Sequence, residues 1–177
     1  MIETFNIDNS IRKIPDFPKK GILFYDITSI LVNPDAFRYC IDKMLEFYSD
    51  SNINAIVAIE SRGFLFAGPL AIKLNLPLII IRKKGKLPGE TYSEDISLEY
   101  GIDTIEVHKS DIKEGLKVLL IDDLIATGGT LKGAINLLSK GRTEVKEIFG
   151  VVGLPFLNYD KLLEGFSIKT LINYNSE

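Results

Sequence analysis

The sequence predicts an α/β fold in which a mostly parallel five-stranded sheet is flanked by helices. Five short apolar runs can each form a buried strand, because strands covered on both faces are apolar throughout instead of alternating. Segments with helical spacing of apolar residues lie between several of these runs, and such alternation is typical of parallel sheets. The chain has 177 residues, of which 46% are hydrophobic. This suits a single domain that spans residues 1–177.

The first two segments of the chain are an irregular region and a helix. Residues 1–33 contain several breakers of regular structure, among them Pro18 and Gly21. Pro34 is a residue type that can open a helix, and apolar residues then recur at helical spacing up to Tyr48.

Strands and helices then alternate along the chain. The apolar runs predict strands at 55–59, 78–81, 118–121, 148–152 and 168–172. Helical spacing predicts one helix at 62–74 and another that begins near Leu131 and is ended by Gly141.

Residues 85–110 break this rhythm with a long polar stretch. Such a segment inside a compact domain is usually a lid or an edge hairpin. Charged residues mark both of its ends, so we expect a lid that closes over a binding site.

The most informative motif begins at the end of the third predicted strand, where Asp122 and Asp123 are adjacent. The loop that follows consists of Ala126, Thr127, Gly128, Gly129 and Thr130. Open α/β sheets place their ligands at the carboxyl ends of strands. Glycines let backbone N–H groups approach an anion closely, and a helix start favours negative charge. The motif therefore predicts a ligand with a phosphate at one end and vicinal hydroxyls, or a metal, at the other.

Two charged motifs follow the first and second predicted strands. Ser61 and Arg62 precede a helix start, which is a natural anion site. Arg82, Lys83 and Lys86 lie in a run of cations that could meet a pyrophosphate.

These motifs resemble those of the type I phosphoribosyltransferases, and residues 118–130 are similar to that family's signature for phosphoribosyl pyrophosphate (PRPP). Four further segments resemble the adenine phosphoribosyltransferases in the same order along the chain: 15–18 with 21–24, 60–66, 82–89 and 97–101. The resemblance covers about residues 11–153 and is poor in the last two dozen residues.

The resemblance implies the type I phosphoribosyltransferase fold, with an N-terminal hood at 1–33 and a flexible lid hairpin at 85–110. It implies that Asp122 and Asp123 hold the ribose hydroxyls and that the loop after them holds the 5′-phosphate. Arg62 would bind pyrophosphate.

A cis peptide between Glu60 and Ser61 is implied beside the pyrophosphate. The resemblance also implies a homodimer. Arg82, Lys83 and Lys86 would bind the leaving pyrophosphate, and they could do so across the dimer interface.

On the base side, the resemblance implies that Phe24 stacks on the purine and that backbone groups near Leu23 and Tyr25 read its Watson–Crick edge. Glu99 would face the purine N7 as a general acid, with Tyr100 beside it in the lid. Glu99, Tyr100 and Arg62 are thus the candidate catalytic residues.

Tyr25 departs from the pattern, because many family members have an arginine there. Backbone contacts at this position do not depend on the side chain. The alternative for Phe24 and Tyr25 is packing within the hood.

The implied activity is that of a pentosyltransferase, which transfers the 5-phosphoribosyl group of PRPP to adenine and gives AMP and pyrophosphate in purine salvage. Mg²⁺ would enter with PRPP and could contact Asp122 and Asp123. A net charge of −3 disfavours a nucleic-acid partner, and no apolar stretch is long enough for a membrane span. One cysteine rules out an internal disulfide and one histidine rules out a zinc site built on several histidines, so a cytoplasmic protein is expected.

Three alternatives remain at this point. The same chemistry could use hypoxanthine, xanthine or orotate, although no lysine of the kind that reads a 6-oxopurine is evident in the hood. A regulator could keep the fold as a PRPP sensor. A dinucleotide binder is disfavoured, since no G-x-G-x-x-G turn follows the first strand.

Overall fold

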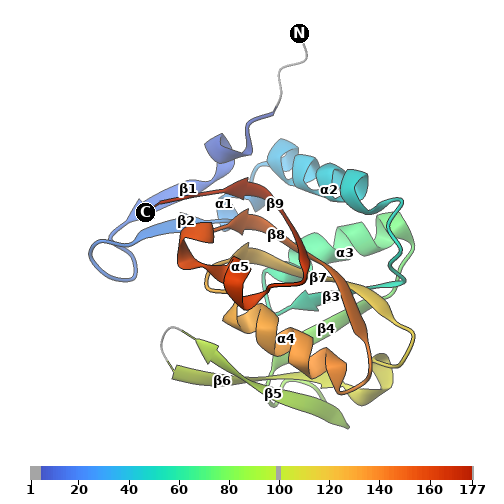
Figure 1. The fold of residues 1–177 in the computed structure, drawn as a ribbon. Helices are drawn as coiled ribbons and strands as arrows, with labels where there is room; N and C mark the ends of the chain where they lie inside the picture. Colours follow the sequence, from blue (N-terminus) through green and yellow to red (C-terminus); the bar gives the residue numbers. More distant parts are fainter. Residues whose placement is uncertain (1–4, 99–100, 177) are drawn as a thin grey trace.

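The predicted sheet is present and is larger than expected (Figure 1). The computed structural model describes residues 5–98 and 101–176. The main sheet has seven strands, in the spatial order β5 (Thr91–Leu98), β6 (Gly101–His108), β4 (Leu78–Lys83), β3 (Ala55–Ile59), β7 (Lys117–Ile125), β8 (Glu144–Gly153) and β9 (Ser167–Asn173).

The five strands predicted from apolar runs are β3, β4, β7, β8 and β9, and their pairings with one another are all parallel. The prediction of a mostly parallel sheet is confirmed, and the expected lid hairpin adds two strands to the five predicted ones. The predicted lid forms the antiparallel hairpin β5–β6, and β6 pairs with β4, the last strand of the parallel part, through Arg82 opposite Glu106 and Lys83 opposite Ile105. The sequence predicts the hairpin but not its pairing with β4, because its polar strands have only one buried face and lack the continuous apolar runs that mark the other sheet strands.

The strand order reverses at β3, which pairs with β4 on one side and with β7 on the other. In open α/β sheets a ligand binds at such a switch point, outside the carboxyl ends of the strands. The chain segments that leave β3 and β7 therefore share the position where a site is expected.

Helices cover both faces of the sheet (Figure 1). Helices α2 (Pro34–Tyr48) and α3 (Gly63–Leu74) pack on one face, and α4 (Gly129–Ser139) and the short α5 (Tyr159–Leu162) on the other. Alternate residues of β3 point to opposite faces, so Ile56 contributes to the first core and Val57 to the second. Within the described residues, no helix combines the length and the apolar character needed to cross a lipid bilayer.

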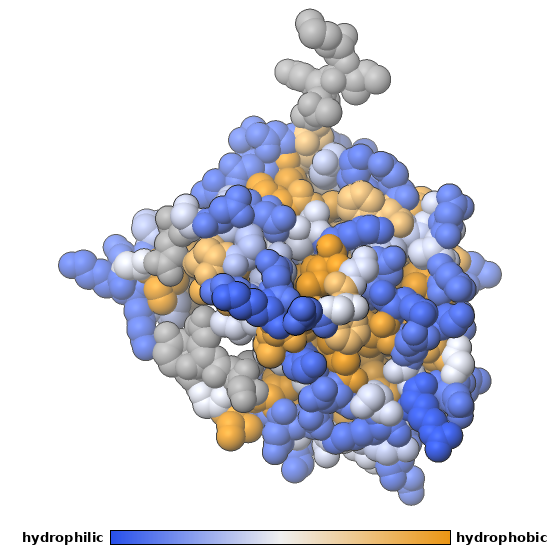
Figure 2. Space-filling model, in the orientation of Figure 1, coloured by the Kyte–Doolittle hydropathy of each residue, from blue (hydrophilic) through white to orange (hydrophobic). Residues whose placement is uncertain are grey.

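The predicted hood contains its own two-stranded antiparallel sheet, formed by β1 (Arg12–Pro15) and β2 (Leu23–Asp26). The helix α1 (Thr28–Leu31) leads from it towards α2. Short 3₁₀ turns lie at Ile7–Ser10, Lys109–Asp111 and Pro155–Leu157. In the view of Figure 1, the surface is mostly hydrophilic with apolar residues showing between the charged ones (Figure 2).

The lid hairpin is attached to α4 through β5, in the half of the hairpin that leads to its turn. Ile96 of β5 is buried against Gly133, where an added Cβ would lie 2.1 Å from the Ile96 Cγ2 atom. Lys140 reaches across to Glu94, with 2.7 Å between Nζ and Oε2. The lid is thus packed into the domain near Ile96, and glycine inside α4 is what permits this close approach.

We predict that Gly133→Ala destabilises the natural chain but stabilises a chain in which the neighbouring Ile96 is replaced by alanine. In the natural chain the new methyl group overpacks against Ile96 and should lower the free energy of unfolding by about 1–3 kcal/mol. In an Ile96→Ala background the clash is absent, and alanine should stabilise the helix by about 0.5–1 kcal/mol. Urea denaturation of the four proteins measures both effects. Equal destabilisation in both backgrounds would contradict this account of the lid's attachment.

Candidate active site

Acidic, basic and glycine-rich segments meet at the carboxyl edge of the sheet, at the switch point between β3 and β7. Arg62 follows β3, the acidic pair lies on β7, and the glycine loop connects β7 to α4. The basic turn, residues 82–86, begins in the last two residues of β4 and continues past its end. The structure thus brings together motifs that are up to 70 positions apart in the chain.

The acidic pair lies within strand β7 and not after it. Pairing with β3 ends at Ile121, whereas pairing with β8 continues as far as Ile125. Asp122 and Asp123 therefore extend past the end of β3 while their backbone remains held by β8. The predicted end at residue 121 reflects the loss of apolar residues and not the loss of backbone pairing.

The surroundings of Asp122 disfavour the ionised form of its carboxyl group. Burial raises the pKa of its carboxyl well above the usual range, and the neighbouring charge of Asp123 raises it further. The nearby Arg62 guanidinium acts in the opposite direction. A carboxyl held in such surroundings at a cleft is a candidate for function, because stability alone does not favour it.

Asp123 binds Arg62, with 2.6 Å between Oδ2 and Nε. The Asp123 side chain is 7% exposed and that of Arg62 is 44% exposed. Within the described part of the chain, Oδ2 has no partner at hydrogen-bond geometry, so the ion pair is its contact. Arg62 is thus fixed at one nitrogen and keeps exposed surface for a ligand.

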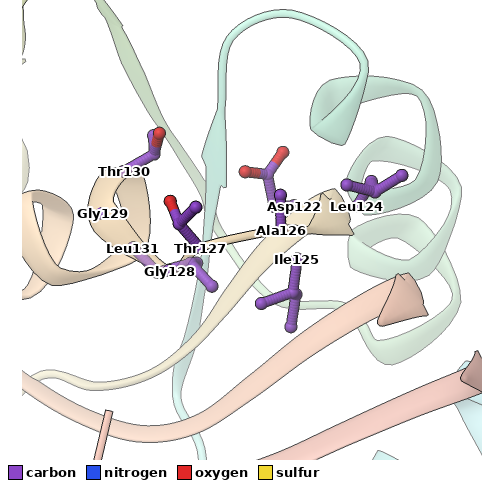
Figure 3. A pocket seen from close by; sticks show the side chains of 9 residues that line it. All are labelled: Asp122, Leu124, Ile125, Ala126, Thr127, Gly128, Gly129, Thr130 and Leu131. Carbon is purple, nitrogen blue, oxygen red and sulfur yellow. The ribbon is translucent and has the colours of Figure 1, made fainter. Parts of the chain in front are cut away.

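The glycine loop encloses a cavity of about 70 Å³ beside Asp122 (Figure 3). In Figure 3 the Asp122 carboxylate and the side chains of Thr127 and Thr130 lie on the same side of the loop. The predicted loop residues, Ala126, Thr127, Gly128, Gly129 and Thr130, all line this cavity. The first N–H groups of a helix have no partner within it, so the start of α4 offers donors to an anion here.

Glycine is required at position 128 for two reasons. Its φ is +83°, in the left-handed region that favours glycine. An added Cβ would also lie 3.1 Å from the Cβ of Tyr159. The loop therefore packs closely against Tyr159, the first residue of α5.

The basic turn is organised by Glu60, which lies at the end of β3. Its carboxylate accepts hydrogen bonds from Lys86 Nζ at 2.6 Å, from the Lys83 backbone N–H at 2.9 Å and from Arg82 Nη2 at 3.3 Å. Burial would raise the pKa of Glu60, but these donors together outweigh it and lower the pKa to about 2. Glu60 thus fixes the turn in one conformation and stays ionised.

The predicted pyrophosphate-binding cations are all paired with carboxylates. In addition to the pairs with Glu60, Lys83 Nζ lies 2.7 Å from Asp103 Oδ2 in the lid. A cavity of about 160 Å³ lies between the turn and the lid, and its lining combines four isoleucines with Glu60, Lys83, Asp103 and Thr130. An anion that enters this cavity would meet the Lys83 ammonium group and would have to compete with the two carboxylates for the cations they bind.

The hood residues Leu23, Phe24 and Tyr25 line a separate cavity of about 270 Å³, together with Arg62 and Ala126. The Phe17 ring packs edge-on against Phe24, with 5.0 Å between centroids. The size and mostly apolar walls suit a small flat ligand. The alternative of hood packing also applies to Tyr25, since it is 5% exposed and stacks on Tyr174.

Pro18, Ile22 and Leu124 also line this cavity, and they lie in segments singled out by sequence motifs. Sequence reasoning missed Leu154, Phe156 and Leu157, which follow the carboxyl end of β8 at the same edge as the other motifs. Their position after a strand could have predicted that they line a ligand site, but apolar residues there are equally typical of the hydrophobic core.

Three predicted residues remain to be placed. Ser61 is exposed and follows a cis peptide with Glu60, as the sequence resemblance implied. Glu99 and Tyr100 lie outside the described residues, so their catalytic roles stay predictions.

Comparison with known proteins agrees with this geometry. Residues 26–152 match the family model described as phosphoribosyl transferase domain. An adenine phosphoribosyltransferase of Treponema denticola is 63% identical over 171 residues, which cover 97% of this chain and 90% of the relative.

Solved structures give the same result. The adenine phosphoribosyltransferase of Thermoanaerobacter pseudethanolicus is similar with a TM-score of 0.90 and 43% identity, covering 95% of this chain and 98% of that chain. The enzyme of Saccharomyces cerevisiae, complexed with adenine and an imino-altritol bisphosphate, has a TM-score of 0.87 and 36% identity, covering 94% and 96%.

Because the fold disfavours the ionised form of Asp122, we predict that the stability of the folded protein depends on pH. A carboxyl whose pKa is raised in the folded state stabilises the fold least once it is ionised, so stability falls as the pH rises through the folded-state pKa. Asp122→Asn removes this loss. We expect the variant to match the natural chain in acid and to melt at a higher temperature near pH 8. Thermal unfolding from pH 3.5, below the ordinary carboxyl pKa of 3.8, to pH 8 measures the difference, with the exposed Asp35→Asn as a control for substitution of a carboxylate elsewhere on the surface. A parallel pH profile for Asp122→Asn would contradict the electrostatic argument.

Proposed function

This chain belongs to the adenine phosphoribosyltransferase family, and we propose that it transfers the 5-phosphoribosyl group of PRPP to adenine, giving AMP and pyrophosphate in purine salvage. The observation that carries the proposal is the order of three adjoining cavities. Ala126 is shared by the hood cavity and the loop cavity, and Thr130 is shared by the loop cavity and the cavity at the basic turn. A base, a sugar phosphate and a pyrophosphate would occupy them in that sequence.

The sugar phosphate fits the middle cavity. Asp122 and Asp123 would accept hydrogen bonds from the ribose 2′ and 3′ hydroxyls, and the loop after them would bind the 5′-phosphate. The ribose is thereby held at both ends, with its C1′ between the base and the leaving group. Such alignment lowers the barrier by removing freedom of motion before the reaction.

The reaction breaks the bond from C1′ to the pyrophosphate oxygen, which keeps the electron pair, as the purine N9 forms a bond to C1′ and the base gives up its N9 proton. The ribose passes through a state that resembles an oxocarbenium ion. The two carboxylates favour this developing positive charge. The purine N9 supplies the electron pair, so the chain's residues act by position and charge.

The leaving pyrophosphate gathers negative charge that Arg62 and the basic turn would stabilise. Lys83 and Lys86 are held by Asp103 and Glu60 before the ligand arrives. A polyanion would compete with these carboxylates for cations whose positions are already fixed.

We also propose that Mg²⁺ accompanies PRPP. The residues fit this ion, because Mg²⁺ prefers oxygen ligands and usually combines one or two carboxylates with substrate phosphates and water. Asp122 and Asp123 provide such oxygens, and Asp123 Oδ2 has no other partner than Arg62 within the described residues. When bound, the ion neutralises charge on the pyrophosphate.

Proton transfer at the base is proposed for Glu99, with Tyr100 beside it. In the sequence both lie between the last residue of β5 and the first residue of β6, and Ile96 of β5 packs on α4. The lid would exclude water, which would otherwise hydrolyse PRPP.

The base is the point that an assay settles. The purified protein is incubated with Mg²⁺, PRPP and each of adenine, hypoxanthine, guanine, xanthine and orotate, and the nucleotide formed is identified. We expect AMP and pyrophosphate in equal amounts and no other nucleotide above background. A different nucleotide would overturn the choice of base, and PRPP binding without any turnover would favour the sensor alternative.

We further propose that the chain acts as a homodimer, and that the face made by α3 and the start of β4 is covered in it. Leu65, Ile72 and Leu78 are 44%, 84% and 37% exposed there. The space beside Ile72 is hollowed, which suits a packed second copy.

We predict that Ile72→Asp converts a dimer to a monomer in sedimentation velocity, because a carboxylate would be buried without a partner. Val32→Asp is the matched control, since Val32 is 79% exposed on a different element. Dimers of unchanged stability in both variants would place the interface elsewhere.

The compartment is proposed as the cytoplasm. The single cysteine, Cys40, is buried and free, and burial raises the pKa of its thiol to about 12. A chain that uses no disulfide suits a reducing compartment.

A further inference from the structure

The C-terminal end of the described chain lies beside the hood, which is formed by the N-terminal part of the sequence (Figure 1). Tyr174 follows β9, and its backbone N–H donates to the Gly153 carbonyl at 3.0 Å. This bond continues the pairing of β8 with β9 by one residue. Tyr174 is therefore fixed to the main sheet through its backbone, while its side chain reaches a different part of the molecule.

The Tyr174 ring stacks on the ring of Tyr25, with 3.9 Å between centroids and 15° between planes. Tyr25 is 5% exposed and belongs to β2, directly after Leu23 and Phe24. Those two residues line the cavity proposed for the base. The stack thus holds the strand that carries the base-contacting residues.

Polar contacts extend this attachment to two more segments of the hood. The Tyr174 hydroxyl donates a hydrogen bond to Asp8, which also binds Lys13 Nζ at 2.8 Å. Lys13 Nζ lies 5.1 Å from the centre of the Tyr174 ring, within the range of a cation–π contact. Lys13 is also the residue that faces Tyr25 across the β1–β2 pair.

Side-chain contacts hold the hood in position. Within the described residues its β1–β2 strands pair with no strand of the main sheet, and an isolated two-stranded sheet has little stability of its own. Apolar residues such as Ile11 and Ile27 bury part of the hood in the main core, and Tyr25 joins that core beside Tyr174. The ion pair between Arg12 and Asp26 is internal to the hood and does not fix it to the sheet. Tyr174 joins the 3₁₀ turn, β1 and β2 to the main sheet through one side chain.

We propose that Tyr174 is a positioning residue for the base, which holds β2 so that Phe24 and the backbone around it face adenine. The inference rests on the proposed function. It predicts that the C-terminal end of the chain sets the affinity for the base and leaves the PRPP site unaffected, because the acidic pair and the glycine loop are built from other elements.

The test compares Tyr174→Ala, Tyr174→Phe and the control Tyr39→Ala in steady-state kinetics. Tyr39 is a matched aromatic residue that packs on Phe5, with 4.9 Å between centroids. We expect Tyr174→Ala to raise KM for adenine roughly 3- to 10-fold, the range of a lost aromatic pair. KM for PRPP and kcat should change by less than about twofold. Tyr174→Phe keeps the stack and should recover most of the adenine affinity, and Tyr39→Ala should resemble the natural enzyme.

Hydrogen exchange gives a second readout that does not depend on turnover. Amide exchange in Tyr174→Ala should rise in residues 12–26 and stay unchanged in β3 and β7. Exchange that rises everywhere, an equal loss for both substrates, or an unchanged KM for adenine would overturn the proposal. Failure of the proposed function would appear separately, as a natural protein that forms no AMP, while exchange would still decide whether Tyr174 holds the hood.

Discussion

The close approach of α3 to strand β7 is the constraint on which the rest of the site depends. A Cβ on Gly63 would lie 3.0 Å from the Ile121 carbonyl oxygen, so glycine lets the first turn of α3 settle on the strand backbone. Arg62 is thereby carried to Asp123, and the segment that leaves β3 meets the segment that leaves β7. A larger residue at position 63 would separate the two sides of the switch point and, with them, the cations from the carboxylates.

Charge explains why this edge of the sheet can bind a polyanion although the chain is acidic overall, with a net charge of −3. Glu60 and Asp103 hold the cations of the basic turn, and Asp123 holds Arg62. These pairs fix positive groups at one place, and a ligand of higher charge can replace the carboxylates as their partner. The same edge also has an unfavourable feature. Burial disfavours the ionised form of Asp122 and raises its pKa, which is typical of a carboxyl that is kept for function.

The five parallel strands and the loop with its acidic pair could be predicted because their signals are local: continuous apolar runs, adjacent carboxylates and paired glycines. Contacts between distant segments could not. Gly133 on α4 is an unremarkable helix residue until Ile96 of the lid packs against it. The apolar wall at Leu154 reads as core in the sequence and lines the base cavity in the structure. Tyr174 lies where the family resemblance is weakest, and its stack on Tyr25 joins residues 149 positions apart.

The acidic pair on β7 and the glycine loop are proposed to bind a phosphorylated sugar together. Isothermal titration of the natural protein with PRPP in the presence of Mg²⁺, beside the same titration of the Asp122→Asn, Asp123→Asn double variant, measures this binding. We expect one saturable site per chain in the natural protein, and binding that is lost or strongly weakened in a double variant that still shows cooperative thermal unfolding. Absence of binding heat in the natural protein across several temperatures, or equal affinity in the two proteins, would contradict this proposal.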